Sequence, residues 1–249
     1  MPTFHVDVSQ TQIRALFSPP LVQATLLRRY KRFLADVRLS DGREVTAHCM
    51  NPGSMKGLTA EGSLVWLTPH DDPKRKLQWT WQIAHEGACP VGVNTNLPNH
   101  LVAAAAEAGA IEALTGYTSF RREVRYGAER SRIDLLAEGH PKDARPCYVE
   151  IKSVTLADAG TALFPDAVTA RGLKHLRELE RVVAQGHRAI MFYLVQRADC
   201  QRFAPARSID PAYAEGVLAA KDAGVEVLVY SAQVSPEGIT LGAPILTTP

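Results

Sequence analysis

The sequence of 249 residues lacks any long hydrophobic run. A helix that crosses a bilayer needs about 20 consecutive apolar residues, and no stretch of this chain approaches that length. The opening segment, MPTFHVD, has no basic region followed by an apolar core, so its pattern does not predict a secretory signal peptide. These absences predict a cytoplasmic protein with no membrane partner.

Cysteine is scarce as well. The four cysteines lie far apart and form no CxxC pair, which argues against a disulfide framework and against a structural zinc site. We interpret them as small buried hydrophobic residues. The remaining composition, 46% hydrophobic and 22% charged, is typical of a globular protein and excludes disordered and coiled-coil classes.

The net charge is only +2, with 28 basic and 26 acidic residues, but the basic residues are clustered. Residues 14–32 contain five basic residues and no acidic one, and residues 121–132 contain five arginines against two glutamates. Clusters of this kind are typical of contacts with phosphate groups. A solvated surface without a ligand is the alternative that charge alone leaves open.

The two halves of the chain differ in periodicity. Residues 34–94 show short alternating segments separated by Asp41-Gly42 and Pro52-Gly53, which predicts an OB-fold-like β-barrel domain over residues 1–97. From residue 98 the order is α-β-β-β-α-β followed by α-β, with helices expected over 101–110, 169–185 and 211–223. We therefore predict a mixed α/β protein whose second domain spans residues 98–249.

Ionisable residues meet on two strands of the second half. If residues 138–146 form the loop of an antiparallel hairpin, Asp134 lies directly opposite Glu150. The two-residue period of a strand puts Arg132 and Asp134 on one face, with Glu150 and Lys152 beside them. The alternate positions form an apolar face, namely Ile133, Leu135, Val149 and Ile151.

Two opposed carboxylates repel each other unless positive charge lies between them. A divalent cation with oxygen ligands resolves that repulsion, and Mg²⁺ typically uses one or two carboxylates with water. Lys152 on the same face can orient a metal-bound water or stabilise charge on phosphorus. The residues alone leave a second interpretation open, a surface salt bridge between Lys152 and the two carboxylates.

Several further motifs make the sequence similar to a known family. They are residues 18–21 (SPPL), 28–33 (RRYKRF), 51–55 (NPGSM), 93–95 (VNT), 123–127 (EVRYG), 131–134 (SRID), 148–155 (YVEIKSVT), 164–167 (FPDA) and 171–179 (RGLKHLREL). In these segments the chain resembles the sugar fermentation stimulation protein A (SfsA) family, from about residue 17 to the C-terminus.

The resemblance implies an N-terminal OB-fold and a C-terminal domain similar to the PD-(D/E)xK, restriction-endonuclease-like nucleases. The nuclease motif falls on Asp134, Glu150 and Lys152 as catalytic residues, with Ile133 in place of the leading proline. Asp134, Glu150 and the carbonyl of Ile151 are then the implied ligands of Mg²⁺, or of Mn²⁺ in its place. An acidic residue of the first core helix often joins such sites, and Glu107 is the candidate here.

The same resemblance implies a DNA-binding protein, with RNA as the other candidate partner. The residues that we expect to contact nucleic acid are Arg28, Arg29, Lys31, Arg32, Arg122, Arg132, Arg171, Lys174 and His175. The strand tryptophans Trp66, Trp79 and Trp81 are either stacking platforms for bases or, as is commoner, core residues.

Two functions of different classes remain open at this point. The first is a DNA-binding protein with a nuclease-like domain that regulates genes of sugar (maltose) metabolism. The second is a Mg²⁺-dependent endonuclease that hydrolyses DNA or RNA. Binding alone does not require the Asp134, Glu150 and Lys152 triad, whereas a fold and a motif do not by themselves establish catalysis.

Overall fold

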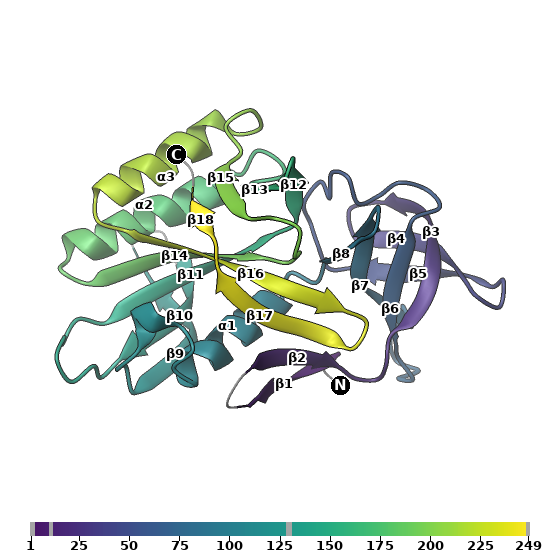
Figure 1. Cartoon of the computed structure of the whole chain (residues 1–249), viewed down its shortest axis with the longest axis horizontal. Helices are drawn as coiled ribbons and strands as arrows, with labels where there is room; N and C mark the ends of the chain where they lie inside the picture. Colours follow the sequence, from purple (N-terminus) through teal and green to yellow (C-terminus); the bar gives the residue numbers. More distant parts are fainter. Residues whose placement is uncertain (1–2, 10–11, 128–130, 248–249) are drawn as a thin grey trace.

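The computed structural model describes residues 3–9, 12–127 and 131–247, and it divides into a barrel and a larger α/β domain (Figure 1). The barrel consists of β3 (Val22–Tyr30), β4 (Leu34–Leu39), β5 (Glu44–Cys49), β6 (Leu64–Pro69), β7 (Trp79–Glu86) and β8 (Cys89–Gly92). Its sheet order is β5-β4-β3-β6-β7-β8, and parallel pairing of β5 with β7 closes it. The predicted OB-fold is thereby confirmed.

The larger domain has a longer list of elements. It contains α1 (Leu97–Glu107), a 3₁₀ turn η1 (Glu112–Leu114), β9 (Ser119–Tyr126), β10 (Ser131–Glu138), β11 (Cys147–Val154), β12 (Leu156–Asp158), β13 (Thr161–Phe164), α2 (Ala170–Ala184), β14 (Arg188–Val195), β15 (Arg202–Pro205), α3 (Pro211–Asp222), β16 (Glu226–Ser235), β17 (Gly238–Pro244) and β18 (Leu246–Thr247). The predicted α-β-β-β-α-β order is present, with the short strands β12, β13, β15 and β18 forming an additional small sheet.

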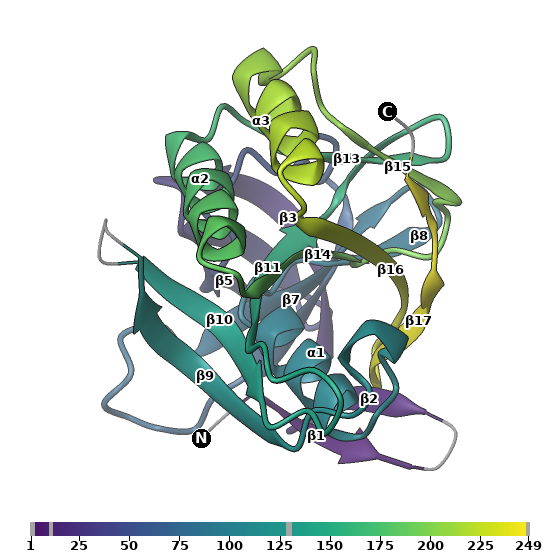
Figure 2. The same ribbon diagram turned by 90° about the vertical axis from the view of Figure 1, so that its left-hand side faces the viewer.

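The central sheet is covered on both faces. Its strand order is β1-β2-β17-β16-β14-β11-β10-β9. Helix α1 packs on one face, with a core that includes Leu101, Leu135 and Val149. Helices α2 and α3 cover the other face, with a second core that includes Leu176, Met191 and Tyr193 (Figure 2). None of the helices in the described ranges combines the length and the apolar character that a membrane crossing needs.

The first two strands belong to this sheet and not to the barrel. Residues 1–97 were expected to form the barrel domain, but β1 (Phe4–Val8) and β2 (Ile13–Phe17) form a hairpin whose second strand pairs with β17. Ile13, Ala15 and Phe17 alternate inward and join the core beneath α1. Alternation shows which side chains are buried, but a local pattern does not show which distant strand supplies the partner.

The helices begin where their capping residues allow. Thr169 caps α2 by accepting a hydrogen bond from the Gly172 amide at 3.0 Å, as the predicted helix start suggests. Helix α1 starts at Leu97, four residues before the position expected from periodicity, because Pro98 occupies its first turn. This earlier start has a functional consequence, since it places Asn99 on the helix.

Specific contacts hold the barrel against the larger domain. The loop after β5 docks on Asp166, whose Oδ2 accepts from the Met55 amide at 2.8 Å and whose carbonyl accepts from Ser54 Oγ at 2.7 Å. Arg197, which is 3% exposed, donates to Glu86 Oε2 of the barrel at 2.6 Å. The four cysteines are free, and three of them are buried as expected.

Candidate active site

The predicted hairpin brings Asp134 and Glu150 together. The predicted register is confirmed from Leu135, which pairs with Val149, onwards, and the ladder ends one residue before the expected pair of Asp134 and Glu150. At Asp134 the regular ladder gives way to a side-chain contact, in which Asp134 Oδ2 accepts from the Ile151 amide at 2.7 Å. The two catalytic candidates therefore lie on adjacent strands at the point where β10 leaves β11.

The strand faces reverse at Asp134, which corrects one expectation. Ile133 was expected to share a face with Leu135, but Ile133 packs in the core beneath α2 and Leu135 in the core beneath α1. The register of β9 and β10 sets Glu123 opposite Asp134, and Glu123 has a left-handed backbone with φ of 54°. A residue in that conformation interrupts the alternation of a strand pair. Asp134 thus occupies a local kink.

Helix α1 supplies a residue that sequence reasoning missed. Asn99 Nδ2 donates to Asp134 Oδ1 at 2.8 Å, so both oxygens of this carboxylate have a fixed partner. Glu107, the acidic candidate on the same helix, is exposed at the opposite end of α1. The only sequence signal for Asn99 was the Pro98 that marks the true start of the helix.

Helix α2 supplies a residue on the other side. Lys152 Nζ donates to Glu150 Oε1 at 2.6 Å, and His175 Nδ1 contacts the same oxygen. Lys152 Nζ and His175 Nδ1 are 3.3 Å apart, and Arg171 Nε donates to His175 Nε2 at 3.4 Å. His175 is only 5% exposed. The structure therefore places this histidine inside the site and not on the surface as a direct contact for nucleic acid.

The two carboxylates have opposite pKa shifts. Burial opposes ionisation of Glu150, but the charge of Lys152 and the contact with His175 outweigh it and hold its pKa below the ordinary value. Burial, followed by repulsion from Glu150, raises the pKa of Asp134 to about 7 despite the Ile151 amide. Without a bound cation, Glu150 is thus the carboxylate that stays ionised.

The oxygen atoms of this site fit a divalent cation. Glu150 Oε2 is buried and has no hydrogen-bond partner among the residues that the structure describes. In an extended strand the N–H and C=O of one residue point to the same side, so the Ile151 carbonyl faces Asp134 as its amide does. The donor set is two carboxylates and one carbonyl; no cluster of three His, Cys, Asp or Glu side chains suited to a metal occurs in the described ranges.

The basic residues of the barrel differ in their roles. Arg28 is exposed and pairs with Asp36 at 2.8 Å. Arg29 is half-buried, and its guanidinium donates to the carbonyls of Arg32, Asn51, Gly53 and Ser54, so it organises two loops. Lys31 and Arg32 are exposed in the turn between β3 and β4.

The basic residues of the larger domain lie on β9, β10 and α2, and two of these elements also carry Asp134 and His175. Arg122 is exposed, with Nη1 at 3.1 Å from His100 Nδ1 of α1. Arg132 is exposed two residues before Asp134, and its register partner on β9 is Arg125. Neither Arg125 nor Arg132 is paired with a carboxylate in the described part of the chain. Arg171 is exposed and Lys174 half-buried on α2.

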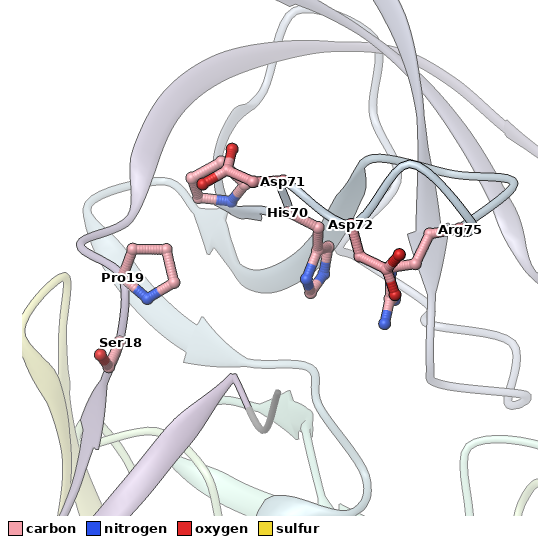
Figure 3. A pocket seen from close by; sticks show the side chains of 7 residues that line it. Ser18, Pro19, His70, Asp71, Asp72 and Arg75 are labelled. Atoms are coloured by element: carbon pink, nitrogen blue, oxygen red, sulfur yellow. The ribbon is translucent and has the colours of Figure 1, made fainter.

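The tryptophans and the cavities add little to the site. Trp81 is fully buried, and Trp66 and Trp79 are half-buried against the cores, which favours the core interpretation over base stacking. A cavity of ≈ 320 Å³ lies beside the barrel (Figure 3). Ser18, Pro19, Pro69, His70, Asp71, Asp72 and Arg75 line it. It shares no residue with the Asp134 and Glu150 site.

Comparison with known proteins covers both domains. Residues 27–93 match the family model described as SfsA N-terminal OB domain, and residues 96–238 match the one described as sugar fermentation stimulation protein RE domain. The chain is 53% identical over 231 residues to the sugar fermentation stimulation protein homolog of Paramagnetospirillum magneticum, covering 92% of this chain and 96% of that one. It is 54% identical over 222 residues to the homolog of Geobacter metallireducens, covering 89% and 94%.

A solved structure agrees with the fold. The structure of Pyrococcus furiosus SfsA in complex with Ca²⁺ superposes with a TM-score of 0.84 at 26% identity. The match covers 93% of this chain and 97% of that chain, so both domains are compared.

Proposed function

The chain belongs to the sugar fermentation stimulation protein A (SfsA) family, and from that premise we propose that it is a nucleic-acid-binding endonuclease that depends on a divalent cation. One observation supports the proposal above all: the buried Glu150 and the half-buried Asp134 lie beside a lysine, and Glu150 Oε2 has no hydrogen-bond partner in the described ranges. A regulatory protein that only binds DNA needs no such arrangement.

Asp134, Glu150 and the Ile151 carbonyl would hold the cation. The family relative from Pyrococcus furiosus was solved with Ca²⁺, and Ca²⁺ and Mg²⁺ both take oxygen ligands. When bound, the cation supplies Lewis-acid stabilisation of the phosphoryl oxygens and lowers the pKa of a water. We assign Mg²⁺ or Mn²⁺ as the ion that supports cleavage.

The protein's own side chains orient the two carboxylates and supply positive charge. Asn99 and the Ile151 amide fix Asp134, and His175 fixes Glu150 Oε1, so that Oε2, which has no hydrogen-bond partner in the described ranges, is available to the cation. Lys152 Nζ adds positive charge where the attacked phosphate becomes more negative. Both carboxylates are thus held before substrate arrives, and preorganised groups of this kind need no rearrangement during the reaction.

Four arginines that form no ion pair with a carboxylate in the described ranges would bind the polyanionic substrate. Arg122, Arg125 and Arg132 lie on the two strands that lead to Asp134, and Arg171 lies above His175. Phosphate contacts from such residues position a nucleic acid without reading its sequence. They account for binding, and the carboxylates account for cleavage.

The test separates binding from cleavage. Purified protein is incubated with single-stranded DNA, duplex DNA and RNA in Mg²⁺, Mn²⁺, Ca²⁺ or EDTA. We expect cleavage that requires Mg²⁺ or Mn²⁺, and a loss of at least about 100-fold in rate for Asp134→Asn and for Lys152→Ala, with affinity in EDTA retained. Glu138→Gln, four residues further along the same strand, is the matched control and should cleave normally.

Two outcomes would overturn the proposal. Full cleavage by Asp134→Asn would place the chemistry elsewhere or in a contaminant. Tight binding without cleavage of every substrate, in every metal, would favour the other function left open by the sequence, a DNA-binding regulator with a nuclease-like domain.

A further inference from the structure

We propose that the turn between β3 and β4, residues 31–33, is a stacking site for an unpaired base, so that the protein selects single-stranded nucleic acid. The inference rests on the proposed function, because it names the substrate class of that nuclease. We call Lys31, Arg32 and Phe33 the stacking turn. It differs from the tryptophan positions considered above, which face the cores.

The stacking turn presents an exposed aromatic ring next to two cations in the chain. Phe33 is 45% exposed, which is unusual for a large apolar side chain in this protein. Lys31 and Arg32 precede it and are exposed, and no carboxylate in the described ranges pairs with either. The His48 ring is tilted at 36° to the Phe33 ring, with the two centroids 6.5 Å apart. An open aromatic face with adjacent positive charge matches a base and its phosphates.

The turn is held in a single conformation. Lys31 and Arg32 both have left-handed backbones, with φ of 48° and 62°. Arg29 Nη2 holds the Arg32 carbonyl at 2.8 Å, and the Phe33 carbonyl accepts from the Cys49 amide at 2.8 Å. Two successive left-handed residues are what a tight hairpin turn requires, and these contacts hold the two non-glycine residues in that conformation. A platform fixed in advance loses little entropy when a base stacks on it.

A chain of contacts joins this turn to the catalytic site. Arg29, which holds the turn, also donates to the Gly53 carbonyl at 2.9 Å, and the neighbouring Ser54 is bonded to Asp166 of the larger domain. Asp166 precedes the start of α2, and that helix carries Arg171 and His175 to Glu150. The turn and the carboxylates are therefore linked through hydrogen-bonded segments of both domains.

The geometry favours a single strand over a duplex. In a duplex each base is covered on both faces by its neighbours, so an aromatic side chain gains nothing from it without unstacking. In a single strand one face is available, and stacking on aromatic rings tolerates any base. Lys31 and Arg32 can bind the phosphates of a single strand or of a duplex, whereas Phe33 can stack only on an unpaired base.

Fluorescence anisotropy of the full chain in EDTA tests this directly. The probes are a labelled oligothymidylate of about 15 nucleotides and a duplex of the same length. We expect Phe33→Ala and Phe33→Leu to weaken binding of the single strand by about tenfold, and that of the duplex by less than about twofold. Phe33→Trp should retain the affinity. Leu218→Ala, an exposed apolar residue on α3, is the matched control and should change neither.

Photocrosslinking supplies a second readout. An oligonucleotide containing 4-thiothymidine should crosslink to Phe33 or its immediate neighbours, and the Trp variant should preserve the crosslink. Equal losses for single strand and duplex in Phe33→Ala, no loss for either, or full affinity in Phe33→Leu would each overturn the stacking site.

Failure of this inference is distinguishable from failure of the proposed function. If Phe33→Ala keeps its single-strand affinity while Asp134→Asn loses cleavage, the nuclease stands and the stacking site is wrong. If single-strand affinity depends on Phe33 but the wild type cleaves nothing in Mg²⁺ or Mn²⁺, the stacking site stands and catalysis is wrong.

Discussion

The barrel and the β9–β10 hairpin both carry arginines on antiparallel strands, but they place different residues opposite them. In the barrel, Arg28 faces Asp36 and Arg38 faces Glu44, and each pair is joined at 2.8 Å. In the hairpin, Arg125 faces Arg132. Opposite charges across a strand pair stabilise it, while like charges destabilise it.

The difference shows where an external anion is needed. The barrel strands pair Arg28 and Arg38 with carboxylates, so within the predicted cluster at residues 28–32 the charge of Arg28 is neutralised. The hairpin retains a local excess of positive charge next to Asp134. A phosphate between the two arginines would relieve their repulsion, so the hairpin is the stronger candidate for contact with the substrate backbone.

The largest effect is expected for a third kind of arginine, one that is paired and also buried. Arg197 binds Glu86, Asp199 and the Thr155 carbonyl and joins the barrel to the larger domain. Arg197→Ala should lower the free energy of unfolding by about 3 kcal/mol, because it leaves these acceptors without their donor. Arg28→Ala, which breaks an exposed pair, should cost no more than about 1 kcal/mol. Urea denaturation measures both, and equal losses would contradict this distinction.

A smaller effect, on the affinity for nucleic acid, is expected when a carboxylate is placed opposite an arginine of the hairpin, as in the barrel. Arg125→Glu places a carboxylate opposite Arg132 and should lower affinity for nucleic acid by about tenfold, with a salt dependence reduced by about one unit of slope. Arg38→Glu changes the net charge equally in the barrel and should alter affinity by less than about threefold. Anisotropy titrations at several salt concentrations compare them. Equal losses would show that only the total charge matters.

The smallest effect is expected on the stability of the fold at acidic pH. Two hydrogen bonds from Arg197, each of 2.7 Å, lower the pKa of Asp199 to about 2 from 3.8. A depressed pKa in the folded state stabilises the protein above pH 4, and that contribution is lost as pH falls from about 4 to about 2. The difference in Tm between the wild type and Asp199→Asn should therefore narrow across this window. A difference that stays constant would mean that the charge of Asp199 does not stabilise the fold.

Local patterns predicted a large part of the structure. The hairpin register and the start of α2 follow from alternation, turn residues and a capping threonine, all of which act within a few residues. The placement of Asp134 and Glu150 on adjacent strands was predictable for the same reason, since it depends only on the loop between two neighbouring strands.

Other features of the site depend on contacts between distant segments. Asn99 reaches Asp134 across 35 positions of the chain, and the burial of His175 depends on how α2 crosses β11. The reversal of faces at Asp134 depends on the left-handed backbone of Glu123, and a glutamate in the sequence does not predict that conformation. Arg29 was predicted to contact nucleic acid, because no local pattern reveals that the carbonyls it binds belong to two separate loops.

The pairing of β2 with β17 also shapes how the chain folds. Residue pairs such as Ala15 with Ile239 close a loop of more than 200 residues, and that loop includes the entire barrel. Contacts of such long range form slowly, because the entropy of loop closure must be overcome before they stabilise anything. During synthesis all the barrel strands emerge well before β17. The barrel is therefore expected to fold early, while β1 and β2 await the strand that completes their sheet.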